Sequence, residues 1–266
     1  MLAILLFTLI GIFIGVMSSL FGFGGGFIVV PILYAFLPES IPHAYLMHTA
    51  IGTSLAVMIV NSFNSTLNHA KQGNVHWPVF HYLAIFIAIG SLFGAVAASF
   101  IESEWLRYAF IGFLLYVIVS NIIKKTFTTA ITDSHFRFPK RRYAGANGVC
   151  IGWISSMLGI GGSVMTIPYL RKRGLNMLHA VALATPLGLP IAIVGTTTYM
   201  ILGANVSGMP ASTLGFIYIP ALIGFTIGGF AGVPIGRRIA QVLPDKIFSK
   251  AYLVLLAIVV IFMIVG

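Results

Sequence analysis

A stretch of glycines between two apolar runs occurs twice in this chain, once in each half. The first copy, Phe21 to Pro31, reads FGFGGGFIVVP, and the second, Leu158 to Pro168, reads LGIGGSVMTIP. When Phe21 is aligned with Leu158, nine of 21 positions from Gly11 to Pro31 are identical in the second half, namely Gly11, Ile14, Gly15, Ser18, Ser19, Gly22, Gly24, Gly25 and Pro31. The match indicates an internal duplication, so any interpretation of one copy must also explain the other.

Each copy predicts a helix, a glycine turn and a second helix. Glycine takes up backbone conformations that other residues avoid, which suits sharp turns, and the apolar runs beside it are typical of helices. The run after the first turn, Phe27 to Leu37, offers about 11 apolar residues and roughly 16 Å of helix. That is about half of a hydrocarbon core of ~30 Å, so this helix cannot cross a membrane alone.

Composition places the chain in a membrane. Hydrophobic residues make up 59% of the 266 residues and charged residues only 8%, and the mean hydropathy is +1.03. Long apolar runs indicate a helical bundle, because a barrel would show short alternating strands. The single cysteine, Cys150, excludes a disulfide framework. The formal charge of +10 comes from basic residues at the ends of apolar runs, which favours membrane orientation over nucleic-acid binding.

The predicted architecture is an all-α integral membrane protein of two inverted repeats, each a broken re-entrant helical hairpin with a glycine-rich turn plus three transmembrane helices. Residues 1–123 form the first repeat, 124–142 a basic cytoplasmic linker and 143–266 the second repeat. Leu2 to Leu20 belongs to the fold rather than to a signal peptide, because it lacks a basic start and its counterpart recurs in mid-chain. The expected spans are Leu46–Leu67, Pro78–Ile101, Trp105–Ile123, Met177–Leu202, Thr213–Ile235 and Ile247–Val265, and the second hairpin comprises Ala144–Leu158 and Val164–Leu170.

The basic residues predict how the chain lies in the membrane. Three spans per half is an odd number, so hairpins that enter and leave on one side force the two halves into opposite orientations. With the 124–142 linker in the cytoplasm, every Lys and Arg except Arg107 falls inside. If 144–170 crossed once as a single helix, Arg171 and Arg237 would lie outside with their basic neighbours. We therefore expect a bacterial inner-membrane protein with both termini outside, whether the hairpins stop midway or cross fully.

The glycine turns are the first candidate binding site. Backbone N–H groups are free at the start of a helix, and the helix dipole adds roughly +0.5 charge there, which makes such ends anion sites. Two inverted hairpins would bring two such ends together near the middle of the membrane. The alternative is that the glycines only permit close helix packing. The predicted substrate-binding residues of the turns are Gly24, Gly25, Gly26, Gly161, Gly162 and Ser163.

Hydroxyl groups follow each hairpin. A register one position shorter than that of the glycine turns aligns Thr49 with Thr185, and both could donate to an anion together with Thr53. The alternative for these threonines and for Ser54 is hydrogen bonding between helices. Further along the same helices lie weaker candidates, namely Asn61, Asn64, Thr197 and Thr198.

The same two helices carry predicted hinge residues. The register that aligns Thr49 with Thr185 also aligns Gly52 with Gly188, and the second copy adds Pro186 and Pro190. Proline removes a backbone donor and frees a carbonyl one turn back, which normally kinks a membrane helix. A kink at these positions would supply the hinge that a transporter needs.

His48 is the one ionisable residue expected near the pore. It could carry a proton or donate to substrate, and the alternative is a buried neutral ring bonded to a backbone carbonyl. The acidic residues all fall in loops or at span ends, so a carboxylate relay, a cation site and an intramembrane enzyme are not expected. His69, His76 and His81 lack metal-ligand spacing. We therefore predict no catalytic residue, no metal and no cofactor.

The chain resembles the TauE/SafE family of sulfite and organosulfonate exporters. The resemblance rests on two GxGG(G/S)xxxxP elements, each followed by a span that opens with small residues, HTAIGTSL at His48 to Leu55 and ATPLGLP at Ala184 to Pro190. Ser163 departs from the pattern by replacing the third glycine. The resemblance implies a transporter that exports sulfite or a short organosulfonate.

The function expected from these features is export of a small anion by alternating access. An inside-negative potential favours anion exit by ~2.3 kcal/mol per 100 mV and per charge, so export needs no coupled ion. Two alternatives remain open. One is an anion channel or uniporter whose glycine turns form a filter, and the other is an uptake permease, which would need coupling. The expected partners are the anion and the lipid bilayer.

Overall fold

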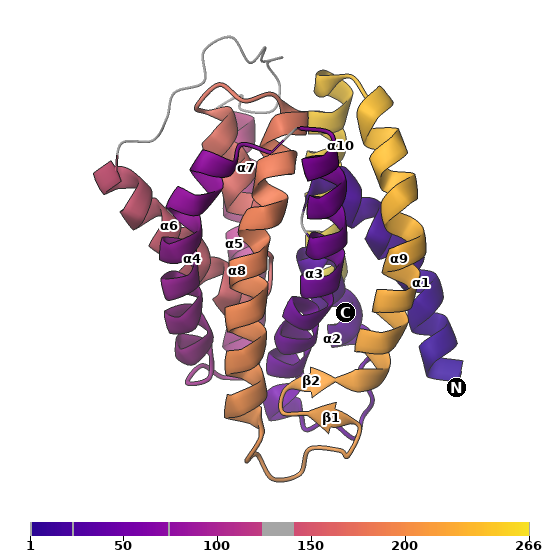
Figure 1. Cartoon of the computed structure of the whole chain (residues 1–266). Helices are drawn as coiled ribbons and strands as arrows, with labels where there is room; N and C mark the ends of the chain where they lie inside the picture. Colours follow the sequence, from indigo (N-terminus) through magenta and orange to yellow (C-terminus); the bar gives the residue numbers. More distant parts are fainter. Residues whose placement is uncertain (1, 23, 74, 124–140, 266) are drawn as a thin grey trace.

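The structure, a computed structural model, describes residues 2–22, 24–73, 75–123 and 141–265 and is almost entirely helical (Figure 1). Most of the predicted basic linker, 124–142, lies outside these ranges. The first half contains α1 (Leu2–Phe21), α2 (Gly26–Phe36), a 3-10 turn at His43–Tyr45, α3 (Leu46–Lys71), α4 (Trp77–Ala98) and α5 (Ser103–Ile123). The second half contains α6 (Arg141–Leu158), α7 (Ser163–Arg171), α8 (Met177–Gly203), β1 (Thr213–Leu214), β2 (Ile217–Tyr218), α9 (Ile219–Val242) and α10 (Asp245–Val265).

The bundle has the properties of an integral membrane protein, as predicted. Seven of the described helices, α1, α3, α4, α5, α8, α9 and α10, are long and apolar enough to cross a membrane. Large apolar side chains such as Phe93, Tyr116 and Ile261 are exposed on the outer surface, where a soluble protein would place polar groups. The helices that follow the glycine turns are short, with 11 residues in α2 and 9 in α7.

One predicted boundary is wrong. A span was expected at Thr213–Ile235, but its first residues form a small antiparallel hairpin in which Thr213 pairs with Tyr218, and α9 begins at Ile219 and runs to Val242. Gly215, with φ +57°, lies in the two-residue turn, and such hairpin turns require a positive φ. Pro220 at the start of α9 suits the first helical turn. The first residues of the expected span therefore form a β-hairpin, and the helix begins only after it.

The first helix of each half packs against a helix of the other half. The first helix of the first half, α1, packs on α9, and the first helix of the second half, α6, packs on α4. Both contacts are close because glycines meet main-chain carbonyls, as in small-xxx-small membrane helix pairs. A Cβ would lie 2.1 Å from Val149 O at Gly90, 2.1 Å from Trp153 O at Gly94, 2.1 Å from Ile12 O at Gly232 and 2.2 Å from Val16 O at Gly236. Val149 and Trp153 are the counterparts of Ile12 and Val16 in the register that aligns Phe21 with Leu158.

The glycine turns lie inside the bundle, against its two most buried helices. α3 and α8 pack on each other, α2 packs on α3, and α7 packs on α8. In Figure 1, α1 starts at the lower right and α2 lies in the lower half, whereas α6 starts at the upper left and α7 lies near the top. The two hairpins thus approach the centre from opposite ends of the bundle. Their orientation relative to a membrane stays a prediction.

Arg107 joins three helices at one end of the bundle. Its Nε and Nη2 donate to Met263 O at 3.1 and 2.8 Å, and the guanidinium carbon lies 4.9 Å from the centre of the Tyr34 ring. Cations stabilise the C-terminal end of a helix, where carbonyls are left without partners. Arg107, the one basic residue that the predicted orientation places outside, therefore connects α5 to the ends of α2 and α10.

Candidate functional site

Three glycines in each turn have a left-handed backbone, which costs most other residues free energy. Their φ angles lie between +63° and +92° in the first turn and between +68° and +72° in the second. The two sets occupy equivalent positions of the duplication and comprise Gly22, Gly24 and Gly25, then Gly159, Gly161 and Gly162. The predicted glycine turn is therefore present in both copies.

The two turns contact each other directly. Ser163 Oγ donates to Gly22 O, and Gly26 at the equivalent position approaches Gly159 O so closely that a Cβ would lie 2.7 Å from it. Ser54 of α3 joins the two turns, because its Oγ lies 2.9 Å from Gly26 O and 3.0 Å from Gly159 O. These contacts hold the starts of α2 and α7 side by side within the bundle.

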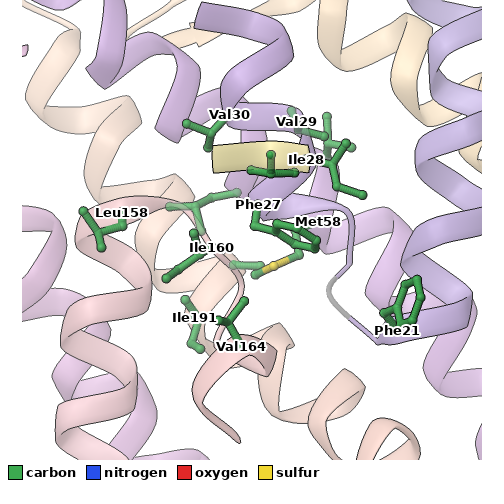
Figure 2. Close-up of a cluster of buried hydrophobic side chains, with 14 of the residues drawn as sticks. Phe21, Phe27, Ile28, Val29, Val30, Met58, Leu158, Ile160, Val164 and Ile191 are labelled. Atoms are coloured by element: carbon green, nitrogen blue, oxygen red, sulfur yellow. The ribbon is translucent and has the colours of Figure 1, made fainter. Parts of the chain in front are cut away.

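Apolar side chains surround this junction. Figure 2 shows Phe27 and Ile160, from the two hairpins, with Met58 of α3 and Ile191 of α8 nearby. All four side chains are buried. The dielectric constant around the turns is consequently low, and a dipole there acts more strongly than it would in water.

Both short helices begin without a side-chain cap. Gly25 precedes α2 and Gly162 precedes α7, and glycine has no side chain that could cap a helix start. In the second turn, Ser163 N donates to Gly161 O at 2.8 Å, and the amides of Gly161 and Gly162 donate no backbone hydrogen bond within the described residues. Uncapped helix starts carry a partial positive charge, so the junction is suited to an anion.

Neutral polar side chains lie beside the turns without partners. A Cβ on Gly24 would lie 2.3 Å from Ser62 Oγ, and one on Gly25 would lie 3.5 Å from Asn61 Nδ2. Near the second turn, Ser155 Oγ lies 3.6 Å from the Cβ position of Gly162. These side-chain atoms are buried and make no hydrogen bond within the described residues. Buried polar groups of this kind are normally satisfied, so they are donors available to a ligand or to water.

Of the other predicted binding residues, only Thr185 lies beside a turn. Its Oγ1 lies 2.8 Å from the Cβ position of Gly22 and donates to Val181 O at 2.8 Å. Thr53 Oγ1 instead accepts from Tyr218 N at 2.8 Å, which anchors the β-hairpin on α3.

Thr49 and His48 lie at the start of α3, away from the turns. Thr49 Oγ1 donates to Tyr45 O at 2.9 Å, within its own helix end. His48 Nε2 lies 3.1 Å from Ala98 O, its Nδ1 has no partner within the described residues, and its ring packs 5.4 Å from that of Phe216. Roughly 9 Å of helix separates His48 from Ser54, so His48 and Thr49 do not join the junction in this structure.

The predicted hinge residues lie in continuous helices. α8 runs through Pro186 and Pro190 without a break. A Cβ on Gly188 would lie 3.3 Å from Gly161 O. A Cβ on Gly52 would lie 2.5 Å from Phe216 O. Both glycines thus allow a close backbone approach, and their role as hinges stays a prediction.

Comparison with known proteins settles the family. The family described as "Sulfite exporter TauE/SafE" matches residues 7–263, nearly the whole chain. The chain belongs to the TauE/SafE family. A probable membrane transporter protein of Haemophilus influenzae is 30% identical over 259 residues, which covers 97% of each chain. One from Methanocaldococcus jannaschii is 31% identical over 236 residues, covering 86% of this chain and 81% of its own. A third, YdhB of Bacillus subtilis, is 27% identical over 254 residues and covers 94% of each. No solved structure matches the chain.

Sequence reasoning missed two residues of the junction in this TauE/SafE chain. Ser62 was not considered, and Ser155 was treated only as a repeat identity. The duplication held a usable signal, because both copies have a serine one turn before the glycines, namely Ser18 and Ser155. Ser62 also has a hydroxyl counterpart, because the register that aligns Thr49 with Thr185 pairs it with Thr198, but the Thr198 hydroxyl bonds to its own helix.

Proposed function

We propose that this TauE/SafE protein exports a small oxyanion, sulfite or a short organosulfonate, across the bacterial inner membrane by alternating access. The anion would bind at the junction of the two glycine turns. The observation that carries the proposal is the pair of uncapped helix starts, held together by Ser54 and Ser163 and bordered by unpartnered donors. Sulfite as the substrate comes from the description of the family alone.

Charge at the junction supports an anion. The polar side chains beside the turns, Asn61, Ser62 and Ser155, are neutral donors. The acidic side chains whose exposure is described, Glu39, Glu102 and Glu104, are all exposed. Dipoles and neutral donors hold an anion more weakly than a buried cation would, and a transported substrate must be able to leave.

The absence of a described carboxylate at the junction also supports export without a coupled ion. Carboxylates inside a membrane bundle usually mark proton or cation sites. An inside-negative potential supplies ~2.3 kcal/mol per 100 mV for each negative charge that leaves. The electrical gradient is then a sufficient driving force for net export.

Flux in proteoliposomes tests the proposal. We expect saturable transport of labelled sulfite or sulfoacetate, with counterflow when unlabelled substrate is present on the other side, and much slower transport of acetate. Conductance that does not saturate would favour a channel instead. Concentrative uptake against the potential would favour a coupled permease. No flux of sulfur oxyanions above that of empty liposomes would refute the proposal.

A variant at the junction tests the site. Asn61→Leu removes the unpartnered donor at similar volume, and we expect at least tenfold slower flux with undiminished folded protein, because losing an unsatisfied polar group does not destabilise. Asn121→Leu is the matched control, since Asn121 is also buried but its Nδ2 donates to Val117 O in its own helix. Equal flux in both variants would remove Asn61 from the site.

A further inference from the structure

A run of unpartnered polar side chains continues along α3 beyond the glycine turns. Asn61, Ser62, Ser65, Thr66 and His69 follow one another at positions i, i+1, i+4, i+5 and i+8, which places them on one side of the helix. We call this set the polar face of α3. None of its members is more than 6% exposed. These five side chains carry six buried polar atoms, including both ring nitrogens of His69, that have no hydrogen-bond partner within the described residues.

The polar face differs in this lack of partners from several threonines of the other helices. Thr8, Thr185 and Thr198 each donate to the carbonyl four residues earlier in their own helix. Ser65 and Thr66 make no such bond. Dry, unsatisfied polar groups are costly, and polar groups that persist within membrane helices are usually functional. The hydroxyls of the polar face are therefore available to water or to a solute.

The polar face connects the junction to a basic end of the bundle. Ser62 and Asn61 lie against Gly24 and Gly25 at one end. At the other end Arg237 of α9 donates to Asn68 Oδ1 at 3.0 Å, and its charge acts on the neighbouring His69. Asn61 and His69 are two turns of helix apart, or about 12 Å. Lys71 and Arg238 lie in the sequence next to this end.

The second repeat has no equivalent face. In the register that aligns Thr49 with Thr185, Ser65 and Thr66 correspond to Ile201 and Leu202 of α8, which are apolar. Thr198, the counterpart of Ser62, bonds to its own helix. The polar face is thus not a by-product of the duplication, and it serves only the half of the bundle that carries Arg237.

We propose that the polar face of α3 is the cytoplasmic half of the anion path. Arg237 attracts the anion from the basic end, and His69, Thr66 and Ser65 pass it by neutral hydrogen bonds to Ser62 and Asn61 beside the first glycine turn. This inference rests on the proposed function, because it assigns the route to the same site. A series of weak neutral donors suits conduction, since the anion must both enter and leave each position.

Cysteine accessibility tests the route without using a transported substrate. In a Cys150→Ala background, Ser65→Cys and Thr66→Cys are treated with the sulfonate reagent 2-sulfonatoethyl methanethiosulfonate from the Arg237 side of membrane vesicles. Leu83→Cys is the matched control, because Leu83 is fully buried in α4, within two turns of the helix end on the same side. We expect modification at 65 or 66 to be at least tenfold faster than at 83. Rates equal to the control at both positions would overturn the route.

Flux separates the route from a structural role. Ser65→Ala and Thr66→Val should slow anion flux at least tenfold while the folded protein in detergent is as stable as the wild type or more so. Thr8→Val, whose hydroxyl bonds to its own helix, should leave flux unchanged. Unchanged flux in both variants would overturn the route and leave the proposed function standing. Fast modification at 65 or 66 without any flux of sulfur oxyanions would support the route and refute the proposed substrate.

Discussion

Removal of the Ser54 hydroxyl should loosen the contact between the two glycine turns. Ser54 is fully buried, and its Oγ lies 2.9 Å from Gly26 O and 3.0 Å from Gly159 O. One O–H group serves both carbonyls, so Ser54→Ala deletes a hydrogen bond shared between the two copies of the turn. Both carbonyls lose this donor when the hydroxyl is removed.

The expected cost follows from measurements on other membrane proteins. Hydrogen bonds between membrane helices average about 0.6 kcal/mol and reach at most about 1.7 kcal/mol. Ser54 bridges two acceptors in a dry environment, so we expect a loss of about 1 kcal/mol in the free energy of unfolding. Ser163 Oγ joins the same turns through Gly22 O, and Ser54→Ala and Ser163→Ala should therefore couple by ~0.5 kcal/mol or more.

The free energies of unfolding are measured by titrating the purified protein in mixed micelles with SDS and monitoring the loss of helicity. Thr197→Ala is the control, because Thr197 faces outward and its hydroxyl donates to Ile193 O and Val194 O of its own helix. This control should change stability by less than about 0.5 kcal/mol. If Ser54→Ala matches the control and adds to Ser163→Ala without coupling, these hydroxyls do not hold the turns together.

Three further predictions concern packing, topology and coupling. Gly94→Ala should destabilise the protein by about 1–3 kcal/mol, because the new Cβ would lie 2.1 Å from a carbonyl of α6. Gly112→Ala is the control and should not destabilise, because nothing lies within 4 Å of its Cβ position. Equal melting of the two variants would contradict this. Single cysteines at Ser40 and Arg173 should label from opposite sides of the membrane, outside and cytoplasmic respectively, and labelling from one side would contradict the inverted repeats. His48→Gln should keep the pH profile of sulfonate flux at clamped potential, because the His48 ring lies 3.1 Å from a carbonyl of α4 and away from the junction. A proton current that is lost in the variant would show proton coupling instead.

Local features of this protein could be predicted from the sequence. The left-handed turns fall at the predicted glycines, because only glycine enters that conformation at little cost. The half-length helices α2 and α7 follow from apolar runs too short to span, and the membrane character follows from composition. The β-hairpin was missed, since a short apolar run around Gly215 has no periodicity that separates strand from helix.

Contacts between distant residues were decided only by the tertiary structure. Ser163 was predicted to face substrate, but its hydroxyl donates to Gly22 O, 141 residues away. His48 was expected beside the pore, and helix packing places it against Ala98, at the start of α3 and away from the glycine turns. Whether a buried serine such as Ser65 has a partner depends on which neighbour faces it and on whether its hydroxyl bonds to the carbonyl four residues earlier in its own helix. Residue type determines what a side chain can donate, and only the packed helices determine what it reaches.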